Sequence, residues 1–367
     1  MPKRAAVARR AACSLGGAAL VASVAVLHAS AAPASGREVA TKVPCSGASL
    51  VSAIRTANSR IGGTLALAPH CVYHLTAPFA GQDGLPPITK RITVLGNGAT
   101  IQRDRSATRP FRIFEVVWGG NLDARYLTVR GGKVTGQPEL GGGIQVTAGG
   151  RMNLDHVTVL QNSSARNGGG VAVLGSATIS NSKILANRAA FGGGLVQFGS
   201  ISRTTISKTV IRYNVARFDG GGLEFGGGAA VVRASHITDN SVTSGDGGGG
   251  IFSGAALQVI DSSVDRNHVG VMSKLPGGGG IYNDGPLTLR NTSVSNNRVT
   301  GVTAQGGGLY NLGGHVTLSN VRITGNSAPH APGGVWTDTP IGSGSQITKS
   351  LSANCKGSPV IPAGCMN

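Results

Sequence analysis

Eight clusters of glycine, each followed by one branched aliphatic residue, recur along this 367-residue chain at nearly constant spacing. Successive clusters lie between 24 and 30 residues apart. A fixed period of this length predicts a solenoid, in which each repeat forms one turn stacked on the previous turn. The aliphatic residues that follow the glycines are Ile144, Val171, Leu195, Leu223, Ile251, Ile281, Leu309 and Val335.

A second pattern fixes the register inside each repeat. An apolar residue is followed three positions later by Asn, and the apolar runs are too short for helices and end in Gly, Asn, Ser or Asp, as strands do. Parallel crossovers are right-handed in most proteins, so we expect an all-β, right-handed parallel β-helix of roughly nine to eleven turns. The Asn column consists of Asn162, Asn187, Asn214, Asn240, Asn267, Asn297, Asn326 and Asn354.

The regular recurrence of these asparagines favours a structural role. Asn accommodates a left-handed backbone at a bend better than most residues and hydrogen-bonds neighbouring backbone groups. Stacked in successive turns, its amides form a hydrogen-bonded ladder. We therefore expect the Asn column to hold the turns together.

The start of the chain has the pattern of a secretory signal peptide over residues 1–32. A basic segment around Lys3 and Arg10 precedes a small, apolar stretch, and Ala29-Ser30-Ala31 offers a cleavage site. The alternative is a retained membrane anchor, although the apolar stretch is short and rich in Ala. No later segment is apolar enough to cross a membrane. We therefore expect a mature chain without a membrane span, located outside the cell or at its surface.

Cysteine spacing supports export. Cys13 lies within the signal, and the other four cysteines form two local pairs, Cys45 with Cys71 and Cys355 with Cys365. In an exported protein such pairs predict disulfides, here at the two ends of the repeats. No C-x-x-C motif or matching His cluster accompanies them, so we expect no metal site and no cofactor.

The ends of the repeat region suggest a division into four parts. Leu50, Val51, Ile54 and Ala57 recur at helical spacing between Ser46 and Arg60, which predicts a helix that caps the open end of the solenoid. The expected parts are the signal (1–32), an N-terminal segment with the capping helix (33–63), the β-helix (64–354) and a disulfide-pinned C-terminal end (355–367).

Several motifs resemble those of a known group of proteins. The sequences GGGI-Y-N and L-T-L-x-N-x-x-V-x-x-N, with the opening L-V-S-A-I-R-T-A-N, resemble secreted right-handed β-helix proteins of the pectin-lyase-like superfamily, particularly the exported repeat proteins of actinobacteria. The glycine and Asn repeats are also similar to those of polymorphic outer-membrane autotransporter adhesins. This resemblance implies the fold over nearly the whole mature chain. It implies no single function, because the superfamily contains lyases, hydrolases, epimerases and binding proteins.

The motifs of the enzymes in that superfamily are absent. The chain has no clustered Asp residues of a pectate lyase and no N-T-D, D-D, H-G or R-I-K motif of a polygalacturonase-like hydrolase. Glycoside hydrolysis requires two carboxyl groups at one bond. We expect Asp123 and Asp155 to stack in adjacent turns, with His156 nearby, and these are the catalytic candidates. The alternative is that both carboxylates are solvated and offset by Arg125 and Arg151.

An aromatic column is the stronger candidate site. Phe252, Tyr282, Tyr310 and Trp336 each follow an aliphatic anchor, in a chain with only 4% aromatic residues. Because side chains alternate along a strand, inward anchors place these rings outward. The rings either bind the sugar faces of an extended glycan or only stack on one another. The loops 131–140, 268–276 and 298–305 are the longest that enter the glycine corners, and such insertions often wall a binding face.

Charge favours anionic partners. Without the four basic residues of the signal, 29 Lys and Arg remain against 15 Asp and Glu. A basic exported protein attracts uronate glycans, teichoic acids or other anionic cell-surface polymers, and the same charge also serves solubility and nonspecific adhesion. Nucleic acid is not expected as a partner, because no recognition motif occurs. We therefore expect polysaccharide association through the aromatic column, with a polysaccharide lyase or hydrolase, or a non-enzymatic adhesin or structural protein, as alternatives.

Overall fold

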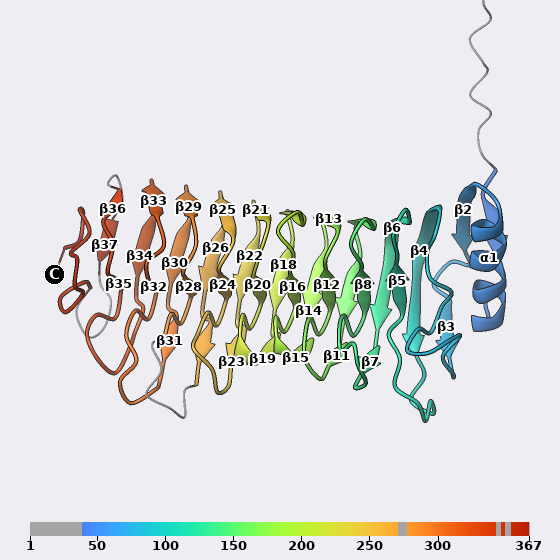
Figure 1. Cartoon of the computed structure of the whole chain (residues 1–367), viewed down its shortest axis with the longest axis horizontal. Coiled ribbons are helices and arrows are strands. Elements are labelled where there is room, and N and C mark those ends of the chain that lie inside the picture. Colours follow the sequence, from blue (N-terminus) through green and yellow to red (C-terminus); the bar gives the residue numbers. More distant parts are fainter. Residues whose placement is uncertain (1–38, 271–276, 343–345, 349–353, 367) are drawn as a thin grey trace, which may run out of the picture. The chain divides into compact units, whose positions relative to one another are not determined.

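The computed structural model describes residues 39–270, 277–342, 346–348 and 354–366. The predicted signal (1–32) and part of the 268–276 loop lie outside these residues. Residues 38–367 form one compact unit, a parallel β-solenoid of about 10 turns (Figure 1). Every pairing between named strands is parallel, and the strands of one turn pair with those of the next, as in β13 (Ser176–Ser180) with β17 (Arg203–Ser207).

A typical turn contains four short strands. After β13 the chain bends at Asn181 (φ 48°) into β14 (Lys183–Leu185), and it bends again at Ala186 (φ 52°) into β15 (Arg188–Phe191). A glycine corner then leads into β16 (Leu195–Gln197). Single residues with positive φ therefore separate strands that point in different directions, which lets about 27 residues close one turn of this solenoid.

The strands belong to three sheets. The nine-stranded sheet contains β5 (Phe114–Val116), β8 (Ile144–Val146), β12 (Val171–Val173), β16, β20 (Leu223–Phe225), β24 (Ile251–Ser253), β28 (Ile281–Asn283), β32 (Leu309–Asn311) and β35 (Val335–Thr337). The seven-stranded sheet contains β7 (Lys133–Val134), β11 (Ser163–Ser164), β15, β19 (Val215–Asp219), β23 (Ser241–Val242), β27 (His268–Val269) and β31 (Arg298–Val299).

The largest sheet has 21 strands and bends around the first corner of each turn. Besides β13, β14 and β17 it contains β1 (Thr41–Val43), β2 (Gly62–Leu67), β3 (Val72–Leu75), β4 (Arg91–Arg103), β6 (Asn121–Arg130), β9 (Arg151–Asp155), β10 (Thr158–Leu160), β18 (Val210–Arg212), β21 (Ala229–Arg233), β22 (His236–Thr238), β25 (Ala256–Ile260), β26 (Ser263–Asp265), β29 (Leu287–Arg290), β30 (Ser293–Ser295), β33 (Val316–Ser319), β34 (Arg322–Thr324), β36 (Ile341–Gly342) and β37 (Gln346–Thr348).

The periodic aliphatic residues fill the interior. The anchors after each glycine cluster, from Ile144 to Val335, are all buried, as are the apolar residues from Val159 to Ile323 that precede the Asn column by three positions, such as Ile184 and Ile211. Each aliphatic residue stacks on its equivalent in the next turn, for example Ile184 on Ile211. Burial of this continuous apolar column is the main driving force that keeps the turns stacked.

The Asn column forms a hydrogen-bonded ladder inside the solenoid. From Asn162 to Asn326, each side-chain amide donates to the amide oxygen of the next Asn at 2.9–3.0 Å. The same amide nitrogen also donates to a backbone carbonyl, as Asn187 does to Val159. One expectation was wrong: the residue with positive φ is the one before the Asn, such as Ala186 or Tyr213. The Asn side chain lies inside the bend and hydrogen-bonds to backbone groups, which at the bend have no partner in a neighbouring strand.

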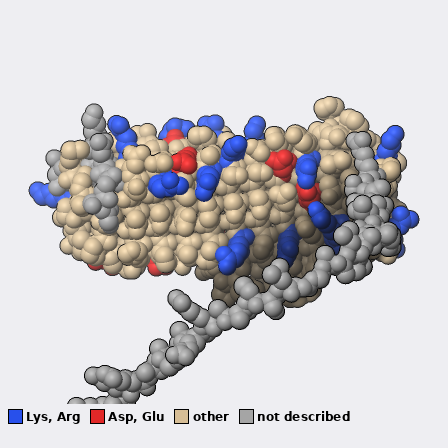
Figure 2. Space-filling view, turned by 90° about the horizontal axis from the view of Figure 1, so that it is seen from above, with Lys and Arg blue, Asp and Glu red and all other residues tan. Residues whose placement is uncertain are grey.

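Most charged side chains lie on the outer surface. On the face drawn in Figure 2, Lys and Arg outnumber Asp and Glu and are spread along the solenoid. Asp239 is paired with Arg212 (2.8 Å) and with Arg266 in the next turn (3.2 Å). Such exposed pairs contribute little to stability, about 0–1 kcal/mol.

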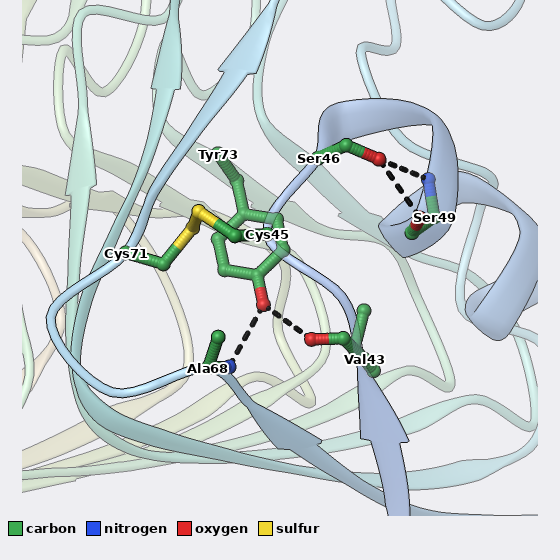
Figure 3. Close-up of a disulfide and its surroundings, with 7 residues drawn as sticks. All are labelled: Val43, Cys45, Ser46, Ser49, Ala68, Cys71 and Tyr73. Carbon is green, nitrogen blue, oxygen red and sulfur yellow. Dashed lines mark hydrogen bonds between the residues drawn. A yellow bond between two sulfur atoms is a disulfide. The ribbon is translucent and has the colours of Figure 1, made fainter.

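The predicted helix is present as α1 (Gly47–Ser59). Ser46 is its N-cap and accepts a hydrogen bond from the backbone N–H of Ser49, while Leu50, Ile54 and Ala57 face the core. Figure 1 shows α1 beside β2 at one end of the stack. A disulfide joins Cys45 to Cys71 just before the helix (Figure 3).

Tyr73 ties the strands around this disulfide together. Its fully buried hydroxyl donates to the carbonyl of Val43 (2.8 Å) and accepts from the backbone N–H of Ala68 (2.9 Å) (Figure 3). At the other end of the chain a second disulfide joins Cys355 to Cys365. No helix within the described residues is long and apolar enough to cross a membrane.

Candidate functional site

The outward-facing middle residues of the nine-stranded sheet form one continuous column. We call it the outward column: Glu115, Gln145, Ala172, Val196, Glu224, Phe252, Tyr282, Tyr310 and Trp336. The eight periodic anchors from Ile144 to Val335 indicate this register, because each is followed directly by one member of the column. The column changes character along its length, because its first five members are polar or small and its last four are aromatic.

The aromatic ladder (Phe252, Tyr282, Tyr310 and Trp336) is a self-stacked pile of rings. The centroids of successive rings are 5.1, 5.3 and 4.1 Å apart, and the ring planes are within 20° of parallel. Tyr282 and Tyr310 are only 6% and 7% exposed. The prediction that a sugar stacks on the ring faces therefore needs correction for Tyr282 and Tyr310, because both faces of these rings are covered by neighbouring rings.

In the other half of the column, Glu224 lines a pocket. This acid pocket has a volume of about 380 Å³, and its principal lining residues are Glu139, Leu140, Arg166, Phe191, Phe198 and Glu224. Glu139 and Leu140 belong to the long loop 131–140, so this insertion does wall the sheet. Phe191 ends β15 and Phe198 follows β16, so two aromatic residues of the preceding turn line the pocket together with Glu224. The pocket combines apolar walls with an amide, a guanidinium and carboxyl groups.

Glu224 is the most unusual residue in this pocket. It is 6% exposed, and its Oε2 atom has no hydrogen-bond partner among the described residues. Burial raises the pKa of its carboxyl well above the usual value, and the nearby carboxylate of Asp219 raises it further. A carboxyl group in such surroundings retains its proton, because ionisation without water or a cationic partner is costly.

Asp219 is the second perturbed carboxyl group. It ends β19, and burial raises its pKa to about 6, with further increases caused by Asp246 and Asp284. Its Oδ1 atom is also buried without a hydrogen-bond partner in the described part of the chain. Nearby backbone N–H groups of Asp246 and Gly247 oppose the increase. Two adjacent carboxyl groups thus hold their protons with different strengths.

The glycine corner brings Asp219 and Glu224 together. Gly220 lies between them in sequence with φ 60°, and a Cβ at this position would be 2.7 Å from the Cβ of Glu224. Glycine is needed here because any Cβ would be too close to the side chain of Glu224, and the left-handed conformation adds to the cost of other residues. The sequence already placed Glu224 in the outward column. It gave no partner, because the partner lies across the corner rather than in the same column.

A buried ion pair lies at the start of the column. Arg112 is 2% exposed, and its Nε is 2.9 Å from Oδ1 of Asp83. Burial raises the pKa of Asp83 to about 7; Arg112 lowers it and Glu115 raises it. These side chains fix the loop before β5 to the first strands of the sheet, so we assign them a structural role.

An exposed indole lies just after β5. Trp118 is 78% exposed and lines a concavity of about 450 Å³ together with Arg91 and Arg151. Arg91 and Arg151 both pair in register with Asn121, one turn to either side, and neither forms an ion pair with a residue that the structure describes. A Cβ at Gly149 would be 2.2 Å from Cε3 of Trp118, so glycine is needed for the ring to lie there. We call Trp118, Arg91 and Arg151 together the indole platform.

Only part of this platform was predicted from the sequence. Arg151 appeared as a counter-charge for acidic residues, and Trp118 was not selected. A Trp directly before a Gly-Gly corner, with basic residues at the start of neighbouring strands, is the signal that would have indicated it.

The predicted catalytic group is not assembled. Asp123 is in register with Asn153, and Asp155 is in register with Arg125, so the two carboxylates do not stack. Asp123 instead forms a two-point ion pair with Arg125 (2.7 and 2.9 Å). The sequence alignment that paired Asp123 with Asp155 was shifted by two residues, because β6 continues through its bend at Tyr126 as one uninterrupted strand.

Asp155 and His156 are likewise engaged on the surface. Asp155 accepts hydrogen bonds from Asn181 (2.8 Å) and Ser180 (2.9 Å), and these interactions lower its pKa, the Asn181 bond most strongly. The ring of His156 stacks on Tyr126 at 4.6 Å. A lowered pKa suits a surface carboxylate and not an acid catalyst at neutral pH.

A larger concavity lies elsewhere, and side chains that line it hydrogen-bond to one another. It measures about 950 Å³ and follows the first corner of the later turns. Its Asn291 donates to Asp261 (2.9 Å) and Asn320 donates to Asn291 (3.0 Å). Within the part of the chain that the structure describes, no three His, Cys, Asp or Glu side chains are grouped so as to hold a metal ion.

Comparison with known proteins adds no assignment. No protein-family model matches the chain, and no curated protein or solved structure is significantly similar to it. The candidate sites for function in this molecule are therefore the outward column, the acid pocket and the indole platform.

Proposed function

We propose that this chain is a secreted β-helix protein that binds an anionic, uronate-containing polysaccharide at the edge of its nine-stranded sheet. The observation that carries the proposal is the indole platform. An exposed aromatic face binds the apolar face of a sugar ring, and Arg91 and Arg151, which form no ion pair among the described residues, bind its carboxylates. The excess of basic residues attracts the same class of polymer over longer distances.

The finer structural assignments belong to the same proposal. The solenoid is a right-handed β-helix of the pectin-lyase-like kind, as parallel crossovers favour, and α1 is its N-terminal cap. Two disulfides are typical of proteins that function outside the cytosol, which supports secretion through the segment 1–32.

Co-sedimentation and calorimetric titration test the binding. Polygalacturonate and alginate are the anionic probes, and dextran is the neutral probe. We expect binding to both polyuronates, weaker binding in high salt because exposed charges are screened, and none to dextran. Equal binding of dextran would contradict the proposed role of the arginines, and no binding to either polyuronate would overturn the proposal.

A matched pair of variants locates the site. Trp118→Ala removes the indole from the platform, whereas Tyr213→Ala removes an exposed aromatic residue that also lies beside an arginine, Arg212, on a different surface. We expect only Trp118→Ala to weaken binding, by about tenfold, which corresponds to about 1.4 kcal/mol. Equal affinities of the two variants would move the site away from Trp118.

A further inference from the structure

The seven-stranded sheet, which contains no residue of the indole platform, has a basic outer face. Its strands run along the lower side of the stack in Figure 1. The only acidic residue in these strands is Asp219, which is largely buried at a glycine corner. On the 21-stranded sheet, by contrast, Arg125 and Arg212 are each paired with an Asp. We call the exposed basic residues of the seven strands, none of which forms an ion pair with a described residue, the basic row: Lys133, Arg188, Arg217 and Arg298.

Two arginines of the basic row line the same concavity. It has a volume of about 340 Å³, and Arg188 and Arg217 line it together with the hydroxyl residues Thr243 and Ser244. None of its lining residues is acidic. We call it the basic cleft. Two cationic side chains share this cleft without a counter-charge from the described part of the protein, so the cleft is suited to an anion.

The backbone directs both arginines to the outer face. Arg188 is opposite Val215, and Arg217 lies two residues beyond Val215 on β19. Side chains two residues apart on a strand point to the same face, and the spacing of strands and residues puts the Cα atoms of the two arginines about 8 Å apart. Both guanidinium groups can therefore reach one small anion.

A β-bulge lies at Arg217. The register between β15 and β19 shifts here, so that Ala190 faces both Arg217 and Phe218. In the next turn a Cβ at Gly245 would lie 1.7 Å from the carbonyl oxygen of Phe218, so a glycine is needed where the bulged backbone passes. Bulges redirect side chains and are frequent beside binding sites. The irregularity therefore lies at the residue that lines the cleft.

Aromatic packing holds the guanidinium of Arg217 in place. Its Cζ atom lies 4.8 Å from the ring centroid of Phe218, and that ring lies 5.2 Å from the ring of Phe191. A guanidinium over an aromatic ring uses its flat face for the contact. Its N–H groups lie in the guanidinium plane, so they remain able to bind an anion.

We infer that the basic cleft binds a phosphate group, and that the basic row binds a polymer of polyol phosphates. A carboxylate has two coplanar oxygens, which one guanidinium satisfies in a bidentate pair. A phosphate group has tetrahedral oxygens that accept from several directions, as two arginines and a hydroxyl provide. This site is independent of the proposed polyuronate site, because the two share no residue.

The length and chemistry of the basic row indicate the kind of polymer. From β7, which contains Lys133, to β31, which contains Arg298, the sheet takes six steps, or about 29 Å at ~4.8 Å per step. A linear polyanion can follow such a row. No large apolar or aromatic side chain of these strands is exposed. Nucleic-acid bases would therefore lack a stacking surface, whereas a polyol phosphate requires none.

The experiment measures the binding of three polymers to the mature protein by titration calorimetry. The probes are poly(glycerol phosphate), a single-stranded oligothymidylate and polygalacturonate. The variants are Arg188→Ala, Arg217→Ala, their combination and Arg217→Lys. The matched control combines Arg203→Ala with Arg233→Ala, which removes two exposed positive charges from the 21-stranded sheet. Melting temperatures confirm that each variant is folded.

We expect poly(glycerol phosphate) to bind more tightly than the oligothymidylate. Arg188→Ala and Arg217→Ala should each weaken its binding by about tenfold, and their combination by about 10²-fold with a shallower dependence on salt. Arg217→Lys should restore only part of the affinity, because lysine keeps the charge and loses the planar fork of donors. The control should stay within about threefold of the wild type, because distant exposed charges are screened.

The inference and the proposed function fail separately. Equal losses in the control and in the combined Arg188 and Arg217 variant would reduce the binding to net charge and overturn the inference. Tighter binding of the oligothymidylate would replace the polyol phosphate with nucleic acid as the partner. Binding of polygalacturonate without binding of poly(glycerol phosphate) would overturn this inference alone, and the reverse result would overturn only the proposed function.

Discussion

The aromatic ladder and the indole platform place aromatic residues on the same solenoid in opposite situations. Tyr282 and Tyr310 stack on their neighbours and are 6% and 7% exposed, whereas Trp118 is 78% exposed beside two arginines without ion pairs in the described chain. Both regions contribute outward-directed rings. The two regions differ because of the repeat. An aromatic residue that recurs in consecutive turns lies about 5 Å from its equivalents, so the rings stack and bury one another.

A single residue that interrupts the repeat has no such partner. Trp118 has Gly149 beneath it rather than another ring, and Glu224 interrupts an otherwise apolar part of the outward column between Val196 and Phe252. In this solenoid the repeated positions provide stability, and the exceptions are the candidates for function.

The largest expected effect is on stability in the ladder. Tyr282→Ala removes a buried ring between two stacked neighbours and should lower the free energy of unfolding by about 3–5 kcal/mol, because it leaves a cavity and removes two stacking contacts. Chemical denaturation monitored by circular dichroism measures the change. A loss below 1 kcal/mol would mean that the ladder does not stabilise the turns.

The acid pocket should make stability depend on pH. Asp219 and Glu224 have raised pKa values in the folded state, so the folded state binds more protons than the unfolded state, and stability is lost as pH rises. Acidification from pH 7.5 to pH 5 should therefore stabilise the protein by about 1–3 kcal/mol.

The double variant Asp219→Asn, Glu224→Gln provides the control for this pH effect. It should remove most of the dependence, and Asp83 should account for the remainder, because its pKa is also raised, to about 7. Melting temperatures measured across this pH range report the result. A wild-type protein that is less stable at pH 5 than at pH 7.5 would contradict the assignment.

At the indole platform, in contrast to the aromatic ladder, we expect a small effect on stability and a larger effect on binding. Trp118→Ala should change the free energy of unfolding by no more than about 0.5 kcal/mol, because the ring is exposed. The same variant should weaken polyuronate binding about tenfold. Thermal unfolding and titration on the same samples separate these two effects, and a destabilised variant with unchanged affinity would reverse the roles of the two regions.

The smallest effect is expected at the surface pair formed by Asp123 and Arg125. Asp123→Asn should cost between about 0 and 1 kcal/mol, because the pair is exposed and screened by solvent. Denaturation at low and high salt measures it. A cost above 2 kcal/mol would show that this carboxylate has a larger role than an exposed ion pair.

The architecture could be predicted from the sequence because the same contacts recur in every turn, so the residues that make them recur at a regular spacing. The glycine corners and the Asn ladder recur once per turn, and this period predicted them. It also predicted the register of the outward column, while the helical spacing of apolar residues predicted α1. The predicted stacking of Asp123 on Asp155 was wrong. These residues lie in the early turns, where the repeats are irregular and β6 is one continuous strand in the place of two separate strands in later turns.

The candidate site was less predictable, since its residues are exceptions to the repeat. Glu224 had a known column position but no visible partner, and Trp118 had no repeating neighbours at all. The sugar-binding role first assigned to the ladder depended on free ring faces, and spacing alone could not show that the rings would stack at 4.1–5.3 Å.

The sequence by itself determined a parallel β-solenoid, its register and the disulfide partners, because these follow from the order and period of residue types along one chain. Only the tertiary structure decided that Asp219 meets Glu224 across a glycine corner, that the ladder covers its own faces and that Trp118 remains open beside two arginines. The physical reason is that burial and pKa depend on contacts between different columns. Their distances are set by how the corners bend, which the period along the chain does not specify.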